Sequence, residues 1–261
     1  MKYNKSLKLV KFSFNDRKRD IKIPKTITSE LSEAVGIIIG DGHVRVKTTG
    51  YRIIISGHAI DDRDYHLNHI IPLFTKLFNI KPNIRSLKRN ETRLTYSSKA
   101  LATLFRYVFG IESVKKDISI PKSIKNSTKS IKIGFLRGLF DTDFSITFKM
   151  NSKNKHSYPV LHFATYSKKI ADNTLVILKE LNFRTSKCTY KSIDKRSGHK
   201  STIYHIFING KNMLLKWNNE IGFGNPKNIK KIKIWEKYGY YPPYTTHEER
   251  NRLLSGGPME I

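Results

Sequence analysis

The chain has 261 residues, one cysteine, and 49 lysines and arginines against 21 aspartates and glutamates, which gives a formal net charge of +28. One cysteine excludes a disulfide framework and a cysteine-based zinc site. Because so large a positive charge would repel itself in a compact protein unless a polyanion shared the surface, a nucleic acid is the expected partner. Without a signal-peptide pattern or an apolar run near 20 residues, we expect a cytoplasmic protein that binds no membrane.

Two stretches of the sequence occur twice, in the same order. The segment "AVGIIIGDGHV" matches "FLRGLFDTDFSI", which places Asp41 over Asp143, and "SSKALATLFRYVFGIESVK" matches "NGKNMLLKWNNEIGFGNPK", which places Lys115 over Lys227. Repeats in one order indicate a duplicated chain. The expected parts are a basic N-terminal segment (1–28), a first half (29–117), a linker (118–129), a second half (130–238) and a C-terminal tail (239–261).

The same order of elements is expected in each half. In the first, a helix capped by Ser29 precedes strands "HVRVK" and "YRIIIS", a helix over 63–79, strands over 83–88 and 92–97, and a helix over 98–109. In the second, a helix capped by Ser130 precedes strands "SITFKM" and "VLHFAT", a helix over 168–181, strands over 186–192 and 202–208, and a helix over 210–220. This order predicts an α+β fold of two pseudo-symmetric αββαββα repeats with antiparallel sheets.

Small residues lie four apart on the first helix of each half. Glycine inside a helix costs about 1 kcal/mol relative to alanine, and two on one face are explained by close packing of two helices. The residues concerned are Gly36, Gly40, Gly138 and Thr142. If these helices pack side by side, Asp41 and Asp143 meet at adjoining negative helix ends. A divalent cation with oxygen ligands, preferably Mg²⁺, relieves their repulsion.

The motifs "VGIIIGDGH" and "LRGLFDTDF" resemble the two dodecapeptide motifs of LAGLIDADG homing endonucleases, and a single chain with both resembles the monomeric members. The resemblance spans about 29–238. It implies motif helices at a central interface and two sheets forming a saddle over the DNA major groove. It also implies that Mg²⁺ or Mn²⁺ is held by Asp41 and Asp143, with Gly40 and Thr142 at the same helix ends.

The resemblance also implies an activity, which is site-specific double-strand cleavage across the minor groove with short 3′ overhangs, in the service of intron or intein homing. Lys115 and Lys227 match the basic position near the metals, with Lys116 as a rival for Lys115. At the usual polar position after the second strand stands Gly57, so His58 is the substitute candidate. Asp141 is expected to be structural, and Phe144 replaces the final glycine of the second motif, which predicts an altered turn.

Basic residues on alternate strand positions are the expected DNA contacts, because alternate side chains share one face. They are Arg45, Lys47, Arg52, Arg85, Lys88 and Arg93 in the first half, and Lys149, Lys187, Lys191 and His205 in the second. Two alternatives use the same scaffold. One is a maturase that binds its own intron RNA, and the other is a DNA-binding regulator, which would be expected to have lost the acids and gained a helix-turn-helix.

Overall fold

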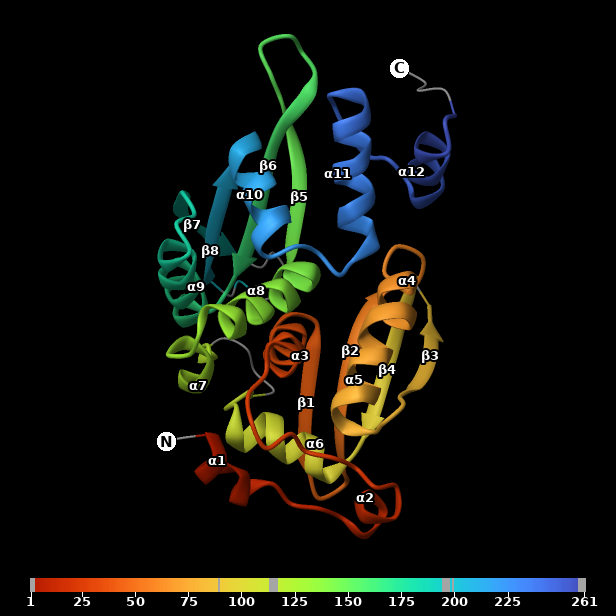
Figure 1. Ribbon diagram of the computed structural model, residues 1–261, viewed down its shortest axis with the longest axis vertical. Helices are drawn as coiled ribbons and strands as arrows, with labels where there is room; N and C mark the ends of the chain where they lie inside the picture. Colours follow the sequence, from red (N-terminus) through yellow and green to blue (C-terminus); the bar gives the residue numbers. More distant parts are fainter. Residues whose placement is uncertain (1–2, 89, 113–116, 194–197, 199, 258–261) are drawn as a thin grey trace.

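The computed structural model describes residues 3–88, 90–112, 117–193, 198 and 200–257. Two four-stranded antiparallel sheets lie on either side of a central pair of helices (Figure 1). No helix in these described ranges is long and apolar enough to cross a membrane. The predicted α+β fold of two αββαββα repeats is confirmed.

The first sheet has the strand order β1-β2-β4-β3. Its elements are α3 (Ser29–Gly40), β1 (Gly42–Lys47), β2 (Gly50–His58), α4 (Arg63–Tyr65), a π-helical turn η2 (His66–Ile70), α5 (Ile71–Phe78), β3 (Asn83–Leu87), β4 (Glu91–Ser97), α6 (Lys99–Thr103) and a second π-helical turn η3 (Leu104–Val108). Val44, Ile53, Ile55 and Leu94 point from the strands into the core under the helices. Their alternation with polar residues is the pattern from which the strands were predicted.

The second sheet repeats this order as β5-β6-β8-β7. Its elements are α8 (Lys129–Asp143), β5 (Phe144–Met150), β6 (His156–Thr165), α9 (Lys168–Glu180), β7 (Thr185–Ile193), β8 (Lys200–Asn209) and α10 (Lys211–Glu220). An aromatic core lies beneath it, in which Phe144 stacks on Phe163 with ring centroids 4.4 Å apart and lies near Trp217. Phe144, which stands where the first motif has Gly42, therefore contributes its ring to this core.

The central helices α3 and α8 pack backbone against backbone. A methyl group on Gly36 would lie 2.7 Å from the main-chain nitrogen of Leu139, and one on Gly138 would collide with the carbonyl oxygen of Glu33. Contacts this short leave no room for any side chain at the two positions. The predicted close approach of the motif helices is therefore present.

Some elements differ from the sequence predictions. Thr128 and Thr28, not Ser130 and Ser29, are the cap residues of α8 and α3, and only Thr28 accepts a capping hydrogen bond, from Leu31 N at 3.1 Å. Segments for which no element was predicted are also helical: α1 (Tyr3–Ser6), η1 (Leu7–Leu9), α2 (Phe14–Lys18), α7 (Lys122–Lys125), α11 (Pro226–Tyr238), which lies within the predicted second half, and α12 (His247–Leu254). The signals for α11 were in the sequence, since Asn225 caps it, Pro226 begins it and Gly239 ends it.

Candidate functional site

The two motif acids lie at adjoining helix ends. Asp41 is the residue after α3, and its N–H donates to Ile37 O at 3.0 Å. Asp143 is the last residue of α8 and is exposed. Its carboxyl carbon lies 3.5 Å from where a methyl group on Gly40 would be, so the two acid-bearing ends meet. The structure thus brings together the four helix-end residues predicted from the motifs: Gly40, Asp41, Thr142 and Asp143.

These helix ends offer oxygen donors, which suit a hard divalent cation. The Thr142 hydroxyl is turned back onto its own helix, where it donates to Gly138 O and Leu139 O at 3.0 Å each. Across the described part of the chain, no group of three or more histidines, cysteines or acids is arranged to hold a metal ion.

Asp141, the third acid near these ends, is almost fully buried. Its Oδ2 accepts a hydrogen bond from Gly224 N at 2.6 Å, and its carbonyl accepts one from Asn225 Nδ2 at 3.2 Å. Burial raises the pKa of Asp141 to about 7, although the hydrogen bonds from Gly224 and Asn225 oppose the rise. Asp141 thus fastens the end of α8 to the segment before α11, in keeping with the structural role expected of it.

A second buried acid joins the two central helices. Glu33 of α3 is 2% exposed and accepts from Arg137 Nη2 of α8 at 2.6 Å, while its other oxygen lies 2.6 Å from His69 Nε2. Burial alone would raise the pKa of Glu33, but the hydrogen bonds from His69 and Arg137 outweigh it and hold that pKa below its usual value. This charged contact across the pseudo-symmetric interface was not predicted.

Lys227, one of the two predicted basic residues, is held between the halves. Its Nζ lies 2.8 Å from Asp62 Oδ1, and the same oxygen accepts from Asn225 Nδ2 at 3.0 Å. Asn225 Nδ2 also donates to the carbonyl of Asp141, so Asp62 and Asn225 link Lys227 to the end of α8. Its counterpart Lys115, with the rival Lys116, lies outside the described residues.

Two histidines near the end of β2 lie in different settings, His58 as the last residue of β2 and His66 as the first of η2. His58, the predicted substitute, is 45% exposed, and its Nδ1 accepts from Asp61 N at 3.2 Å. His66 is buried, and its Nε2 lies 2.7 Å from where a methyl group on Gly57 would be. Burial lowers the pKa of His66. The imidazole of His66 therefore fills the space that a side chain at Gly57 would need, and sequence reasoning missed it.

A half-buried lysine also escaped prediction. Lys231 of α11 donates to Ile146 O of β5 at 3.3 Å. Burial, and then the nearby charges of Lys227 and Arg250, lower the pKa of Lys231 to about 8. Dozens of lysines are spread through the sequence, and nothing in the sequence separates this one from the others.

The open face of each sheet is the face opposite its buried apolar side chains. On the first sheet, Arg45 pairs across the strands with Arg52, and Arg85 pairs with Arg93. Like charges directly opposite each other destabilise a sheet unless an anion lies over them. Lys47 shares this face by alternation, whereas Lys88 lies in the turn after β3. The predicted common face is therefore present for five of the six first-half residues.

The second sheet agrees only in part with its prediction. Lys149 and His205 lie on the open face, but Lys187 pairs with the buried Ile206 and its Nζ lies 2.5 Å from Asp172 of α9. Lys191, four residues on, shares the face of Lys187. The predicted face is therefore wrong for these two lysines. The reason is that β7 is an edge strand without a buried side chain to mark its inner face.

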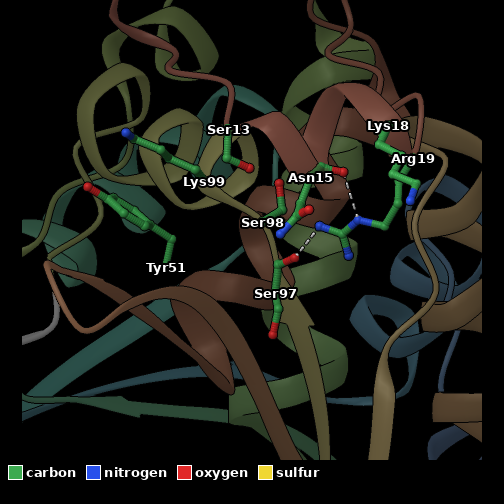
Figure 2. A pocket seen from close by; sticks show the side chains of 8 residues that line it. All are labelled: Ser13, Asn15, Lys18, Arg19, Tyr51, Ser97, Ser98 and Lys99. Atoms are coloured by element: carbon green, nitrogen blue, oxygen red, sulfur yellow. Dashed lines mark hydrogen bonds between the residues drawn. The ribbon is translucent and has the colours of Figure 1, made fainter.

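A hollow of about 480 Å³ lies between α2 and the outer end of the first sheet. Figure 2 shows Arg19 fixed there by hydrogen bonds to Asn15 O (3.2 Å) and Ser97 O (2.7 Å). Lys99 lies over the ring of Tyr51, 5.1 Å from its centroid. The basic N-terminal segment thus extends the positive charge of the first half beyond the strands.

The two antiparallel sheets thus meet at a pair of helices whose ends carry Asp41 and Asp143. Residues 130–222 match the family model described as a LAGLIDADG-like domain. These residues are accordingly a LAGLIDADG-like domain, and the resemblance predicted from the two motifs is confirmed.

Solved structures share the fold. The homing endonuclease I-DmoI, crystallised with DNA and Mn, is 19% identical, with 76% of this chain and 98% of that chain covered and a TM-score of 0.50. Full-length DUF199/WhiA from Thermatoga maritima is 15% identical, with 97% of this chain and 70% of that chain covered and a TM-score of 0.48. At this identity, the likeness to I-DmoI shows the fold alone.

Three curated relatives come from Methanocaldococcus jannaschii. The uncharacterized protein MJ1054 is 32% identical over 69% of this chain, a glutamine–fructose-6-phosphate aminotransferase is 30% identical over 47%, and a replication factor C small subunit is 26% identical over 78%. The matched parts make up 18%, 11% and 10% of those proteins. The chain therefore spans less than a fifth of the length of the curated relatives it matches.

Asp141→Asn should change how stability depends on pH in the metal-free protein. The pKa of Asp141 is raised from 3.8 to about 7 on folding, so the folded state binds the proton more tightly. Its contribution to stability is complete below pH 3.8 and is lost as the pH rises through 7. Between pH 4 and pH 8, wild type should lose on the order of 3 kcal/mol relative to Asp141→Asn.

Urea unfolding in EDTA at both pH values measures this loss. The matched control is Asp117→Asn, because the side chain of Asp117 is 91% exposed. If the free energy of unfolding changed with pH by the same amount in wild type and in Asp141→Asn, the raised pKa of the Asp141 carboxyl would be contradicted.

Proposed function

We propose that the protein is a site-specific double-strand DNA endonuclease. The observation that carries the proposal is the meeting of Asp41 and Asp143 at the seam between two sheets, one of which bears opposed arginine pairs. Two carboxylates beside a phosphate backbone repel it unless they hold a cation, so binding alone would not require them. This disfavours the maturase and the regulator, which need to bind a nucleic acid without cutting it.

The donor set fits a divalent metal. Asp41 and Asp143, with the adjoining residues Gly40 and Thr142, would hold Mg²⁺ or Mn²⁺. When bound, such a cation would polarise the phosphate and lower the pKa of a water molecule. Lys227 supplies positive charge near the end of α8, and Asp62 keeps its side chain in place. The first-sheet arginines hold the duplex by its phosphates and base edges. I-DmoI, which shares the fold, was crystallised with DNA and Mn, in support of this reading.

The curated relatives support the proposal that the chain belongs to a mobile genetic element. An aminotransferase and a replication factor have no chemistry in common, yet each contains a segment similar to this chain. Such a segment is more simply explained as an insertion than as a part of either activity. We propose that the chain acts as a monomer in the cytoplasm, with both halves of its site in one polypeptide, and serves intron or intein homing.

Incubation with a randomised duplex library and Mg²⁺, followed by sequencing of the cut ends, tests this function. The expected result is a set of ends with a long shared sequence, short 3′ overhangs and no cutting in EDTA. Because many basic residues neutralise phosphates, the library is best screened at low salt. Bound RNA without any cut DNA would favour the maturase, and ends without a shared sequence would contradict site specificity.

A further inference from the structure

The open faces of the two sheets differ in chemistry although they occupy equivalent places in the repeat. The first presents the five basic residues described above. On the second, Lys149 is the one lysine or arginine among the described residues of β5, β6, β7 and β8 that point to this face. A surface with so little charge offers a nucleic acid other contacts than the first open face does.

Rings occupy the second open face instead. His162 stacks on Phe207, with centroids 4.7 Å apart and planes 10° apart, and lies beside His205, with centroids 5.0 Å apart and planes 3° apart. Tyr190, 58% exposed, meets the His205 ring edge-on at 4.8 Å, and Lys149 Nζ lies 5.7 Å from the centroid of Phe207. We call His162, Phe207, His205 and Tyr190 the ring cluster. It spans three neighbouring strands.

The ring cluster is held in place by a hydrogen bond between its two histidines. His162 Nε2 and His205 Nδ1 share a hydrogen bond of 2.7 Å, which fixes both rings. Burial, with the nearby His205 and Lys149, lowers the pKa of His162, which keeps that imidazole neutral at neutral pH. Aromatic rings such as those of Phe207 and Tyr190 gain little from a phosphate, but they contact apolar groups on base edges well.

In the major groove, the apolar group on a base edge is the C5-methyl of thymine, which aromatic and other apolar side chains contact. We propose that the ring cluster reads the DNA half-site under the second sheet through thymine methyl groups. This inference rests on the proposed function, because it assumes that the second open face covers DNA as the arginine face does. The equivalent strand order of the two sheets supports that assumption.

The test removes only the methyl groups. In the target selected from the library, each thymine of one half-site is replaced by deoxyuridine, and binding is measured by fluorescence anisotropy with Ca²⁺ in place of Mg²⁺. Substitution under the second sheet should weaken binding about fourfold for each methyl group contacted. In Tyr190→Ala and Phe207→Ala, the affinity for the thymine target should fall, and deoxyuridine should then cost nothing further.

Tyr190→Phe is the matched control, since it keeps the ring and should bind and discriminate as wild type does. This variant tests the contribution of the ring apart from that of the hydroxyl. Because Tyr190 is exposed, the substitution should leave folding unchanged. Deoxyuridine under the first sheet should have the same effect in wild type and in both alanine variants. Arg52→Gln identifies which half-site lies under the first sheet. The affinity that this variant loses should depend on the base sequence of that half-site and not on the sequence of the other.

A second half-site without thymine, or one in which deoxyuridine costs wild type nothing, would overturn the inference. So would a deoxyuridine penalty that persists unchanged in both alanine variants. In each of these cases the protein still binds and cuts DNA, and the proposed function survives. A chain that binds no duplex at all overturns the function and this inference together.

Discussion

Asp41→Asn and Asp143→Asn should each reduce Mg²⁺-dependent cleavage by roughly 10³-fold or more. The reason is that a metal site of this kind contributes several kcal/mol to the transition state, and each tenfold in rate corresponds to about 1.4 kcal/mol. Each half supplies one of the two acids, so either substitution leaves a single carboxylate at the contact between α3 and α8. Cleavage of the selected target, followed over time on a gel, measures the effect.

Binding of the target should be retained by both variants. Removing a carboxylate beside the phosphate backbone takes away repulsion, so the dissociation constant measured without metal should stay the same or fall. Asp117→Asn is the control for the loss of an acid elsewhere on the surface, and it should cut as wild type does. Full cleavage by either Asp41→Asn or Asp143→Asn would contradict the assignment of the acids to the metal.

Much of this architecture was predictable because short sequence patterns mark it. The glycine spacing of the motifs gave the close contact of α3 with α8, since only sterics decide it. The strands of the first sheet could be assigned to a face because Val44, Ile53 and Ile55 mark its inner side. On β7 no buried residue marks either face, and the prediction for Lys187 and Lys191 failed there.

The contacts that tie the halves together were beyond sequence reasoning. Lys227 meets Asp62 from 165 positions away, and Arg137 meets Glu33 from 104. The side chains of these pairs carry no spacing pattern of the kind that the motif glycines have, because their meeting follows from how the two repeats dock. The ring cluster was hidden for the same reason, since His162 and His205 come together only through strand register.

Gly138→Ala should destabilise the protein although alanine is the better helix former. The added methyl group would collide with the carbonyl of Glu33 and lie 3.0 Å from Ile37 N, both main-chain atoms that no rotamer change can move. Overpacking of this kind costs about 3 kcal/mol, and the gain in helix propensity returns about 1 kcal/mol. The net loss of about 2 kcal/mol should lower the melting temperature by roughly 5 °C.

Gly40→Ala gives a matched comparison, because there the obstacle is a side chain. The new methyl group would collide with Thr142 Oγ1 and lie 2.7 Å from Thr142 Cβ. Thr142→Gly should therefore recover stability in the Gly40→Ala background but not in the Gly138→Ala background. A melting temperature for Gly138→Ala at or above that of wild type would contradict the backbone contact. Since this contact also sets the distance between the two acid-bearing helix ends, Gly138→Ala should cut more slowly even at temperatures where it remains folded.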